Sequence, residues 1–329
     1  MPLDIITLGE ALIDLPSTQS GVSLTDAPGF AKVPAGAPAN LAVAAAKLGL
    51  KTAFLSKVGD DAFGECIIQT FAGYGVDTSR VLKDKAGRTG LAFVSVQPDG
   101  SRDFLFYFDP ARDLALRPDE LDGNWLSSAR VLHYGSISLI AEPSRSATLE
   151  AARLAHRGGA LCSYDPNLRP WLWPSEEAMR GGVLLGFPVA DIVKISVDEL
   201  LFLFPDAGDE AAAVACLLGD FPNLRLVAVT EAGAGSRGYT RNGGFANAPG
   251  FQVNFVDPTG AGDAFGAGLL CYLLRQGPDT NAALDNFAAH LPAALRFANA
   301  CGAVATTFRG ATSPLLTEAA VQALLEAHQ

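Results

Sequence analysis

The stretch "VDPTGAGDAFGAG", from Val256 to Gly268, places the acid Asp263 among the glycines of a glycine-rich turn. The residues after the turn are apolar almost throughout, which predicts a helix that begins at about Asp263 and ends near Gly277. The first amides of a helix lack partners within the helix, and the helix dipole adds partial positive charge there. The stretch therefore predicts an anion site, although the GxxxxGK[ST] pattern of a Walker loop is absent.

The acid in this turn admits two interpretations. In the first, Asp263 is the N-cap of the helix, and Gly262, Gly266 and Gly268 allow close helix packing. In the second, a hydroxyl group lies between the carboxylate and a bound phosphate, because the acid would repel the phosphate alone. A carboxylate that accepts the proton of an attacking hydroxyl, beside amides that hold the transferred phosphoryl group, forms a phosphotransfer site.

Strand patterns and helix patterns alternate around this stretch. Apolar runs typical of buried strands are "DIITLGE", "TAFLSKVG", "RVLHYGSIS", "ALCSYDP", "DIVKIS" and "LRLVAVTE". Helical stretches separate them, such as the one closed by Gly49 and the one with Asp61 as its N-cap. This order predicts an α/β fold with three layers, in which helices cover both faces of a doubly wound, mostly parallel sheet. Ligands of such sheets bind beyond the carboxyl ends of the strands.

Residues 12–34 and 88–110 interrupt this alternation. The second segment contains "TGLAFVSVQPDGSRDFLFYF", which predicts a hairpin with Pro98, Asp99 and Gly100 at its turn. We expect a small β-sheet that serves as a lid, inserted in a single domain of residues 1–329. Because the alternating apolar residues of 89–106 would otherwise be exposed, we also expect a homodimer joined through the lids.

A second glycine motif, "GAGSRG", follows the strand "LRLVAVT" and matches the dinucleotide-binding spacing GxGxxG at Gly233, Gly235 and Gly238. The next residues, "YTRNGGF", predict a hairpin rather than a helix. Without a helix N-terminus there is no dipole to hold a pyrophosphate. The motif is therefore interpreted as a glycine turn, which argues against an NAD-dependent dehydrogenase.

The composition excludes further classes of function. With 24 Lys+Arg against 35 Asp+Glu, the net charge is −11, which argues against nucleic acid and anionic membranes as partners. The five cysteines form no CxxC pair, and the N-terminus lacks a basic segment before its apolar run. The four histidines are interpreted as structural residues without metal-ligand neighbours. We expect a soluble cytoplasmic protein.

At the opening stretch the chain resembles the ribokinase-like (PfkB) carbohydrate kinases. "DPTGAGDAFGAGLL" matches the C-terminal motif of that family position for position, and "AGAPANLAVAAAKLG" matches its N-terminal motif. "GDDAFG" follows at the expected distance, and the similarity extends from "GEALIDL" to "TTFRGA". Within the family, "DPNLRPWLWPS", "YGSISL" and "VKISVDEL" look most like fructokinases, with 2-keto-3-deoxygluconate kinases or another sugar or nucleoside kinase of the family as the alternative. The resemblance implies Mg²⁺-dependent transfer from ATP to the primary hydroxyl of a ketose; a catalytically silent sensor of sugar or nucleotide is a remote alternative.

The resemblance also implies roles for the reacting groups and the sugar site. Asp263 would be the general base, and Gly260, Ala261 and Gly262 would supply the amides that hold the γ-phosphoryl group. The residues implied to hold the sugar are Asp14, Gly36, Asn40, Arg169 and Asp263. Three purely structural interpretations stay open: Asp14 as a turn residue at a strand end, Asn40 as a helix N-cap, and Arg169 as a surface ion-pair partner.

The nucleotide and metal sites are implied in the same way. Residues expected along the nucleotide are Lys194, Thr230, Gly235, Gly260, Gly262 and Asn299. Lys194 is alternatively a side chain packed at a strand end. Glu199 would organise the water shell of Mg²⁺, which prefers oxygen ligands and keeps several waters. Asp257 and the Thr259 carbonyl resemble the family's monovalent-cation site, which suggests K⁺ as an additional cofactor.

The chain departs from the family pattern at four positions. Ser196 stands where the NxxE motif has Asn, and Ala232 stands where Gly is expected after the strand that ends at Thr230. In the expected lid, Phe108 replaces an Arg of many relatives and Arg112 replaces an Ala. The last two changes put the preferred sugar in doubt more than the chemistry.

Overall fold

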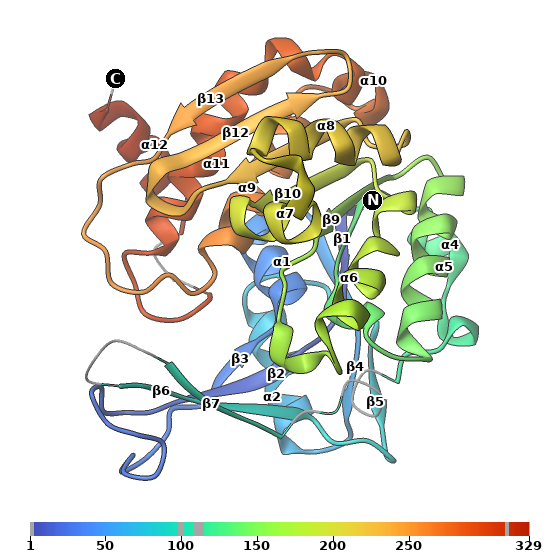
Figure 1. The fold of residues 1–329 in the computed structure, drawn as a ribbon. Coiled ribbons are helices and arrows are strands. Elements are labelled where there is room, and N and C mark those ends of the chain that lie inside the picture. Colours follow the sequence, from blue (N-terminus) through green and yellow to red (C-terminus); the bar gives the residue numbers. More distant parts are fainter. Residues whose placement is uncertain (1–2, 98–101, 108, 110–114, 313–315, 329) are drawn as a thin grey trace.

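The structure is a computed structural model that describes residues 3–97, 102–107, 109, 115–312 and 316–328. Its main sheet has nine strands among these residues, in the order β13-β12-β11-β10-β9-β8-β1-β4-β5 (Figure 1). The strands are β1 (Leu3–Leu8), β4 (Thr52–Gly59), β5 (Val81–Asp84), β8 (Ala129–Gly135), β9 (Leu161–Asp165), β10 (Ile192–Ser196), β11 (Leu226–Thr230), β12 (Gly235–Thr240) and β13 (Phe245–Pro249). All neighbours pair in parallel except β11 with β12 and β12 with β13, so the prediction of a mostly parallel sheet is confirmed.

Helices cover both faces of this sheet (Figure 1). They are α1 (Ala37–Lys47), α2 (Ala62–Gly73), α4 (Gly123–Leu126), α5 (Ser144–Arg157), α6 (Glu176–Leu184), α7 (Val197–Leu203), α8 (Glu210–Asp220), α9 (Ala261–Leu274), α10 (Thr280–Asp285), α11 (Leu291–Ala305) and α12 (Glu318–Ala327). Alternate strand residues enter different cores: Ile5 packs with α1, α9 and α11, whereas Ile6 packs with α5, α6 and α8. The predicted three-layer ribokinase-like fold is therefore confirmed.

Of the residues predicted to cap helices, Asp61 and Gly49 are confirmed and Asp263 is not. The Asp61 side chain caps α2 by accepting the amides of Phe63 and Gly64, at 3.0 and 2.9 Å, as expected. Gly49 lies directly after the C-cap of α1 with φ +87°, again as expected. The interpretation of Asp263 as an N-cap is wrong, because α9 begins at Ala261 with Gly260 as its N-cap. Gly260 has φ +80°, and this left-handed turn starts the helix two residues earlier than predicted.

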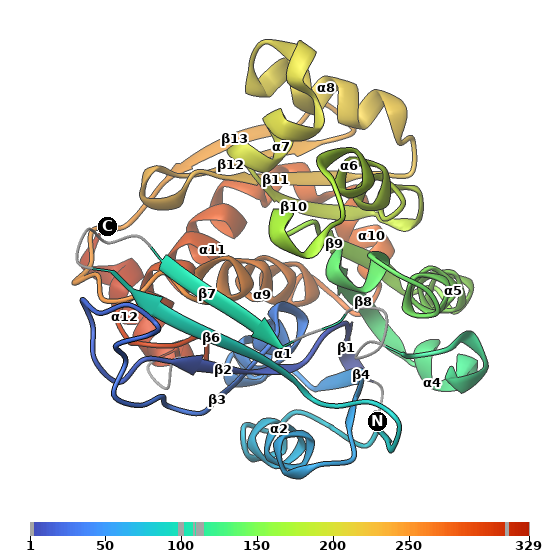
Figure 2. The ribbon, with the colours of Figure 1, turned by 60° about the horizontal axis from the view of Figure 1, so that its bottom comes forward.

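A second, smaller sheet lies below the main one in Figure 1 and is seen from another side in Figure 2. Its order is β3-β2-β6-β7, with β2 (Leu12–Pro16), β3 (Val33–Ala35), β6 (Gly90–Val96) and β7 (Arg102–Tyr107). The pairing of β6 with β7 is antiparallel, so the predicted hairpin strands are confirmed. The expected turn at Pro98, Asp99 and Gly100 lies outside the described residues, as do Phe108 and Arg112.

Among the helices of the described residues, none has the length and apolar character needed to span a bilayer.

Candidate active site

Asp263 lies in the first turn of α9 and is only 9% exposed. Its Oδ2 accepts a hydrogen bond of 2.9 Å from Nδ2 of Asn40, in the first turn of α1. Burial raises the pKa of Asp263 to about 6, although the hydrogen bond from Asn40 and the charges of Lys194 and Arg169 act to lower it. The structure thus holds a carboxylate that is ionised at neutral pH yet basic enough to accept a proton.

The turn before this acid brings its backbone against other segments. A Cβ on Gly260 would lie 2.4 Å from the Ala311 carbonyl oxygen, so only glycine fits there. A Cβ on Gly262 would lie 2.9 Å from Nζ of Lys194, which places that ammonium group beside the helix start. The Ala261 amide donates to the Pro258 carbonyl at 3.1 Å, so it is already engaged. This engagement weakens the expectation that all three residues offer free amides to an anion.

Lys194 is the middle residue of β10, and its side chain reaches the end of β9. Its Nζ lies 3.0 Å from Oδ2 of Asp165, and both side chains are largely buried. Burial alone would lower the pKa of Lys194, but the carboxylates of Asp165 and Glu199 raise it above its ordinary value. Lys194 is therefore a buried cation in an ion pair next to Gly262, rather than only a stem packed at a strand end.

Arg169 lies in the loop that continues from β9. Its Nη1 donates to the carbonyl oxygens of Asn167 and Leu168, at 3.4 and 2.9 Å. Its charge acts to lower the pKa values of both Asp263 and Glu10, which places the guanidinium near the buried acids. The alternative of a purely surface ion-pair residue is therefore disfavoured.

Glu10 is a buried acid that sequence analysis did not single out. It lies two residues after the end of β1, is 2% exposed, and its Oε1 accepts the Ala37 amide at 2.9 Å. Burial raises the pKa of Glu10 to about 7, against the opposing effect of its backbone hydrogen bonds and of Arg169. Since α1 has no side-chain cap of its own, Glu10 satisfies the first amide of the helix that carries Asn40.

The residues expected at the sugar lie on two parts of the fold. Gly36 precedes α1 with φ +138°, and a Cβ there would lie 2.2 Å from the Glu10 carbonyl oxygen. Asn40 is buried, and its Oδ1 has no partner among the described residues, which leaves an acceptor beside Asp263. Asp14 lies half-buried on β2 of the small sheet, opposite Ala92 of β6.

The residues expected along the nucleotide lie at the end of β11, at the start of β12 and in α11. Thr230 ends β11 in register with Ser196 of β10. Gly235 has φ +112°, and a Cβ there would lie 2.2 Å from the Ala248 carbonyl oxygen. The Asn299 amide donates to that same oxygen at 3.0 Å and to the Pro249 oxygen at 3.1 Å. Asn299 thereby holds α11 to the end of β13, close to Gly235.

The two carboxylates expected at metal ions accept hydrogen bonds from backbone amides. Glu199 accepts the amides of Leu168 and Ser196, at 2.7 and 2.9 Å, with one carboxylate oxygen each. Asp257 accepts the Thr259 amide and hydroxyl on Oδ1, at 3.0 and 2.7 Å, and the Gly310 amide on Oδ2, at 2.9 Å. Each oxygen of Glu199 accepts one of these hydrogen bonds and keeps a second lone pair, so this carboxylate fits a cation or its waters.

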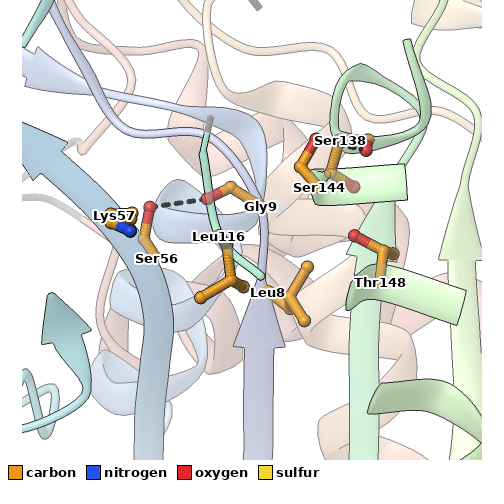
Figure 3. Close-up of a pocket in the computed structure, with 8 residues that line it drawn as sticks. All are labelled: Leu8, Gly9, Ser56, Lys57, Leu116, Ser138, Ser144 and Thr148. Atoms are coloured by element: carbon orange, nitrogen blue, oxygen red, sulfur yellow. Dashed lines mark hydrogen bonds between the residues drawn. The ribbon is translucent and has the colours of Figure 1, made fainter. Parts of the chain in front are cut away.

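Two other clusters lie outside this site. Figure 3 shows a cavity between the ends of β1 and β4 and helix α5, which contains none of the candidate residues. It is lined by Leu8, Gly9, Ser56, Lys57, Leu116, Ser138, Ser144 and Thr148. The expectation that no histidine has metal-ligand neighbours is wrong, since ligand atoms of His156, Cys162 and Asp191 lie within 4.8 Å of one another. His156 Nε2 is 3.2 Å from Asp191, which raises the pKa of His156, so we interpret the cluster as an ion pair.

The described contacts thus bring Asp263, Asn40, Gly262, Lys194 and Asp165 together at one corner, named here the α9 corner. Asp165 and Glu10 were missed, although each lies at the carboxyl end of a predicted strand. Position at the carboxyl end of a strand was a signal that could have found both.

The chain matches the family model described as pfkB family carbohydrate kinase over residues 3–318. It is 46% identical over 323 residues to probable fructokinase-4 of Arabidopsis thaliana, covering 98% of this chain and 96% of that protein. The structure of fructokinase with bound ATP from Xylella fastidiosa superposes with a TM-score of 0.90, at 35% identity, covering 100% of this chain and 99% of that chain. Fructokinase from Vibrio cholerae O395, in a form with fructose, ADP and calcium ion bound, gives a TM-score of 0.83 at 33% identity, covering 98% and 99%. The chain therefore belongs to the pfkB family of carbohydrate kinases, and it is a phosphotransferase.

Proposed function

We propose that this carbohydrate kinase transfers the γ-phosphoryl group of ATP to the primary hydroxyl of fructose, forming fructose 6-phosphate. The observation that carries the proposal is the α9 corner, where a buried acid with a pKa of about 6 lies beside the start of a helix and a buried lysine. The fructokinase relatives support fructose as the acceptor and ATP as the donor.

In this proposal Asp263 accepts the proton of the sugar hydroxyl as that oxygen attacks phosphorus. Asn40 orients the carboxylate through its amide and offers its free Oδ1 to a sugar hydroxyl. Asp14, Gly36 and Arg169 complete the sugar site. The helix start at Gly260, Ala261 and Gly262, together with Lys194, stabilises negative charge that develops on the phosphoryl oxygens.

Thr230, Gly235 and Asn299 would border the nucleotide, because they surround the ends of β11 and β13. Glu199 would hold waters of Mg²⁺. Backbone amides fix its carboxylate by using one lone pair on each oxygen, and the second lone pair of each oxygen is left to accept from such a water. A bound Mg²⁺ would supply neutralisation of the phosphate charge. Asp257 and the Thr259 carbonyl would bind a monovalent cation, with K⁺ as the expected ion.

We further propose that residues 1–329 form one domain in which the small sheet is the lid, and that the protein is a cytoplasmic homodimer joined through the lids. Leu105 and Tyr107 support the dimer, because they lie on one face of β7 and are 48% and 63% exposed. Light scattering at micromolar protein tests it, and a monomeric mass would contradict it.

The deciding experiment measures kcat/KM for a panel of sugars at fixed Mg-ATP. A coupled assay of ADP release gives the rate with each sugar. We expect fructose to rank first. A higher value for 2-keto-3-deoxygluconate would replace the acceptor and leave the phosphotransferase assignment intact. No turnover with any sugar or nucleoside would overturn the proposal.

A further inference from the structure

Three aromatic rings connect the small sheet to the loop that carries Arg169. Phe104 and Phe106 lie on β7, and Trp171 lies in the short 3-10 turn Pro170–Leu172. The ring centroids of Phe104 and Trp171 are 5.5 Å apart, those of Phe106 and Trp171 are 6.1 Å apart, and those of Phe104 and Phe106 are 5.6 Å apart. The planes differ by 12° to 19°, so the three rings are stacked.

The rings occupy the same face of the small sheet as Asp14. Residues paired directly across strands share a face, and Ala92 of β6 pairs with both Phe106 of β7 and Asp14 of β2. Leu105 and Tyr107 occupy the opposite face, where they pair with Phe93 and Leu91. The stack is therefore formed by the face of the sheet that carries a proposed sugar ligand.

The stack leaves apolar surface in water. The exposed fraction of Trp171 is 53% and that of Phe104 is 38%, although the protein buries large apolar cores elsewhere. Grouped apolar rings at the surface of a soluble protein usually mark a functional contact. Here the contact joins a sheet and a loop that are distant in sequence.

The loop that precedes Trp171 connects it to the α9 corner. The Arg169 guanidinium lies 6.0 Å from the Trp171 ring, at the outer limit of a cation–π contact. Next to it, the Leu168 amide donates to Glu199, and the loop starts at Asp165, which pairs with Lys194. The position of Trp171 is thus coupled through a few residues to the groups proposed to act on the phosphoryl group.

We propose that the ring stack is a latch, in which Phe104 and Phe106 fix Trp171 and thereby position Arg169 over the sugar. Trp171 is a positioning residue that acts through Arg169. This inference rests on the proposed function, because it assigns Arg169 to the sugar and the small sheet to a lid. The latch holds the lid against the loop also before a sugar binds, since the rings are stacked in this structure.

A double-mutant cycle with Phe106→Ala, Trp171→Ala and the double variant tests the latch. Each single variant should raise the KM for the best sugar of the panel about threefold to tenfold, the range expected for one aromatic pair. The KM for ATP should change less than twofold. The double variant should lose no more than the stronger single variant, because the two rings act together. Trp171→Phe, which keeps a ring, should recover most of the loss.

Phe245→Ala is the matched control, since Phe245 is an exposed ring that contacts another ring, that of Tyr239, but lies on β13 of the main sheet. It should leave the sugar KM within twofold of the wild-type value. Additive losses in the cycle, or an equal loss in Phe245→Ala, would overturn the latch. Thermal melting of each variant identifies a loss that is due only to unfolding, and Phe104→Ala replaces Trp171→Ala in the cycle if the latter does not fold.

Hydrogen exchange without substrate separates the latch from the proposed function. Trp171→Ala should speed amide exchange in β6 and β7, although Trp171 is not part of the small sheet. Faster exchange in a protein that phosphorylates no sugar would support the latch and contradict the proposed function. Unchanged exchange together with fructose phosphorylation in the wild type would contradict the latch alone.

Discussion

The two glycine motifs of this chain, at residues 260–268 and 233–238, are similar in sequence but lead into different elements of the structure. Gly260 and Gly235 both have positive φ, and a Cβ on either would collide with a backbone oxygen, of Ala311 or of Ala248. After Gly260 the chain enters the 14-residue helix α9, whereas after Gly235 it enters the antiparallel strand β12. The glycines serve close backbone packing in both places, and the element that follows decides whether amides and a dipole face a ligand.

The largest expected effect comes from the acid in the first motif. Asp263→Asn should lower kcat by about 10²- to 10⁴-fold, because general-base help is of that size, while ATP affinity persists. Stopped assays of ADP release and equilibrium nucleotide titration measure the two quantities. Asp119→Asn, at a residue 72% exposed and paired with Arg117, is the matched control and should behave as wild type. Near-normal turnover of Asp263→Asn would show that another group takes the proton.

A pair of alanine substitutions compares the motifs directly. In Gly262→Ala the new Cβ would press on Nζ of Lys194, whereas the space around a Cβ on Gly233 is open. Displacing groups at the reaction centre by about an ångström can cost roughly 100-fold, so we expect a 10- to 100-fold loss in kcat/KM for Gly262→Ala. Gly233→Ala should stay within about threefold. Similar losses in both variants would remove the distinction between the motifs.

The pH dependence of the first motif follows from the raised pKa of Asp263. Below about pH 6 the carboxyl is protonated and cannot accept the hydroxyl proton, so kcat should fall about tenfold per pH unit on the acid side. Because the folded pKa of Asp263 lies above the usual 3.8, stability is lost as pH rises through about 6. Asp263→Asn should therefore gain stability over wild type at pH 8, by up to about 3 kcal/mol, and lose that advantage near pH 4. Urea denaturation at both pH values measures the gain, and a pH-independent difference would contradict the assigned cause.

The smallest expected effect lies in the second motif. Ala232 has φ +43°, a left-handed conformation that costs a residue with a Cβ about 1–2 kcal/mol. Ala232→Gly should raise the free energy of unfolding by about 0.5–1 kcal/mol, after allowance for the greater freedom of glycine in the unfolded chain. Ala234→Gly in the same 3-10 turn is the control and should not stabilise, because Ala234 is not left-handed. Equal effects in the two variants would show that strain at Ala232 is not the cause.

Much of the fold was predictable because its signals are local. Helical stretches separate the apolar runs of β1, β4, β8, β9, β10 and β11 from one another, and the Asp61 cap needs only the amides of Phe63 and Gly64. The helix start was misplaced because an N-cap glycine carries no side-chain signal, so Asp263 was the nearest polar candidate. Ala232 was noted as a departure from the family pattern, and the structure adds the physical consequence, which is a strained backbone.

A site residue could be predicted only where its type and its neighbours in the chain already indicate a chemical role. Asp263 stood out because a lone acid in a glycine turn needs an explanation, and the family resemblance supplied partners for it. Glu10, Asp165 and Trp171 were missed because their roles depend on contacts between distant elements rather than on neighbours in the chain. Trp171 in particular meets Phe104 and Phe106 only through the pairing of a second sheet.

The sequence by itself determined the layered α/β architecture, the glycine turn before α9 and the acid Asp263 that follows this turn. These features follow from periodicity and backbone conformation, which act over a few residues. Only the tertiary structure decided that Asn40 contacts Asp263 across 223 positions of the chain, and that Lys194 faces Gly262. It also decided the basicity of that acid, since burial depends on what packs around a carboxylate and not on its neighbours in sequence.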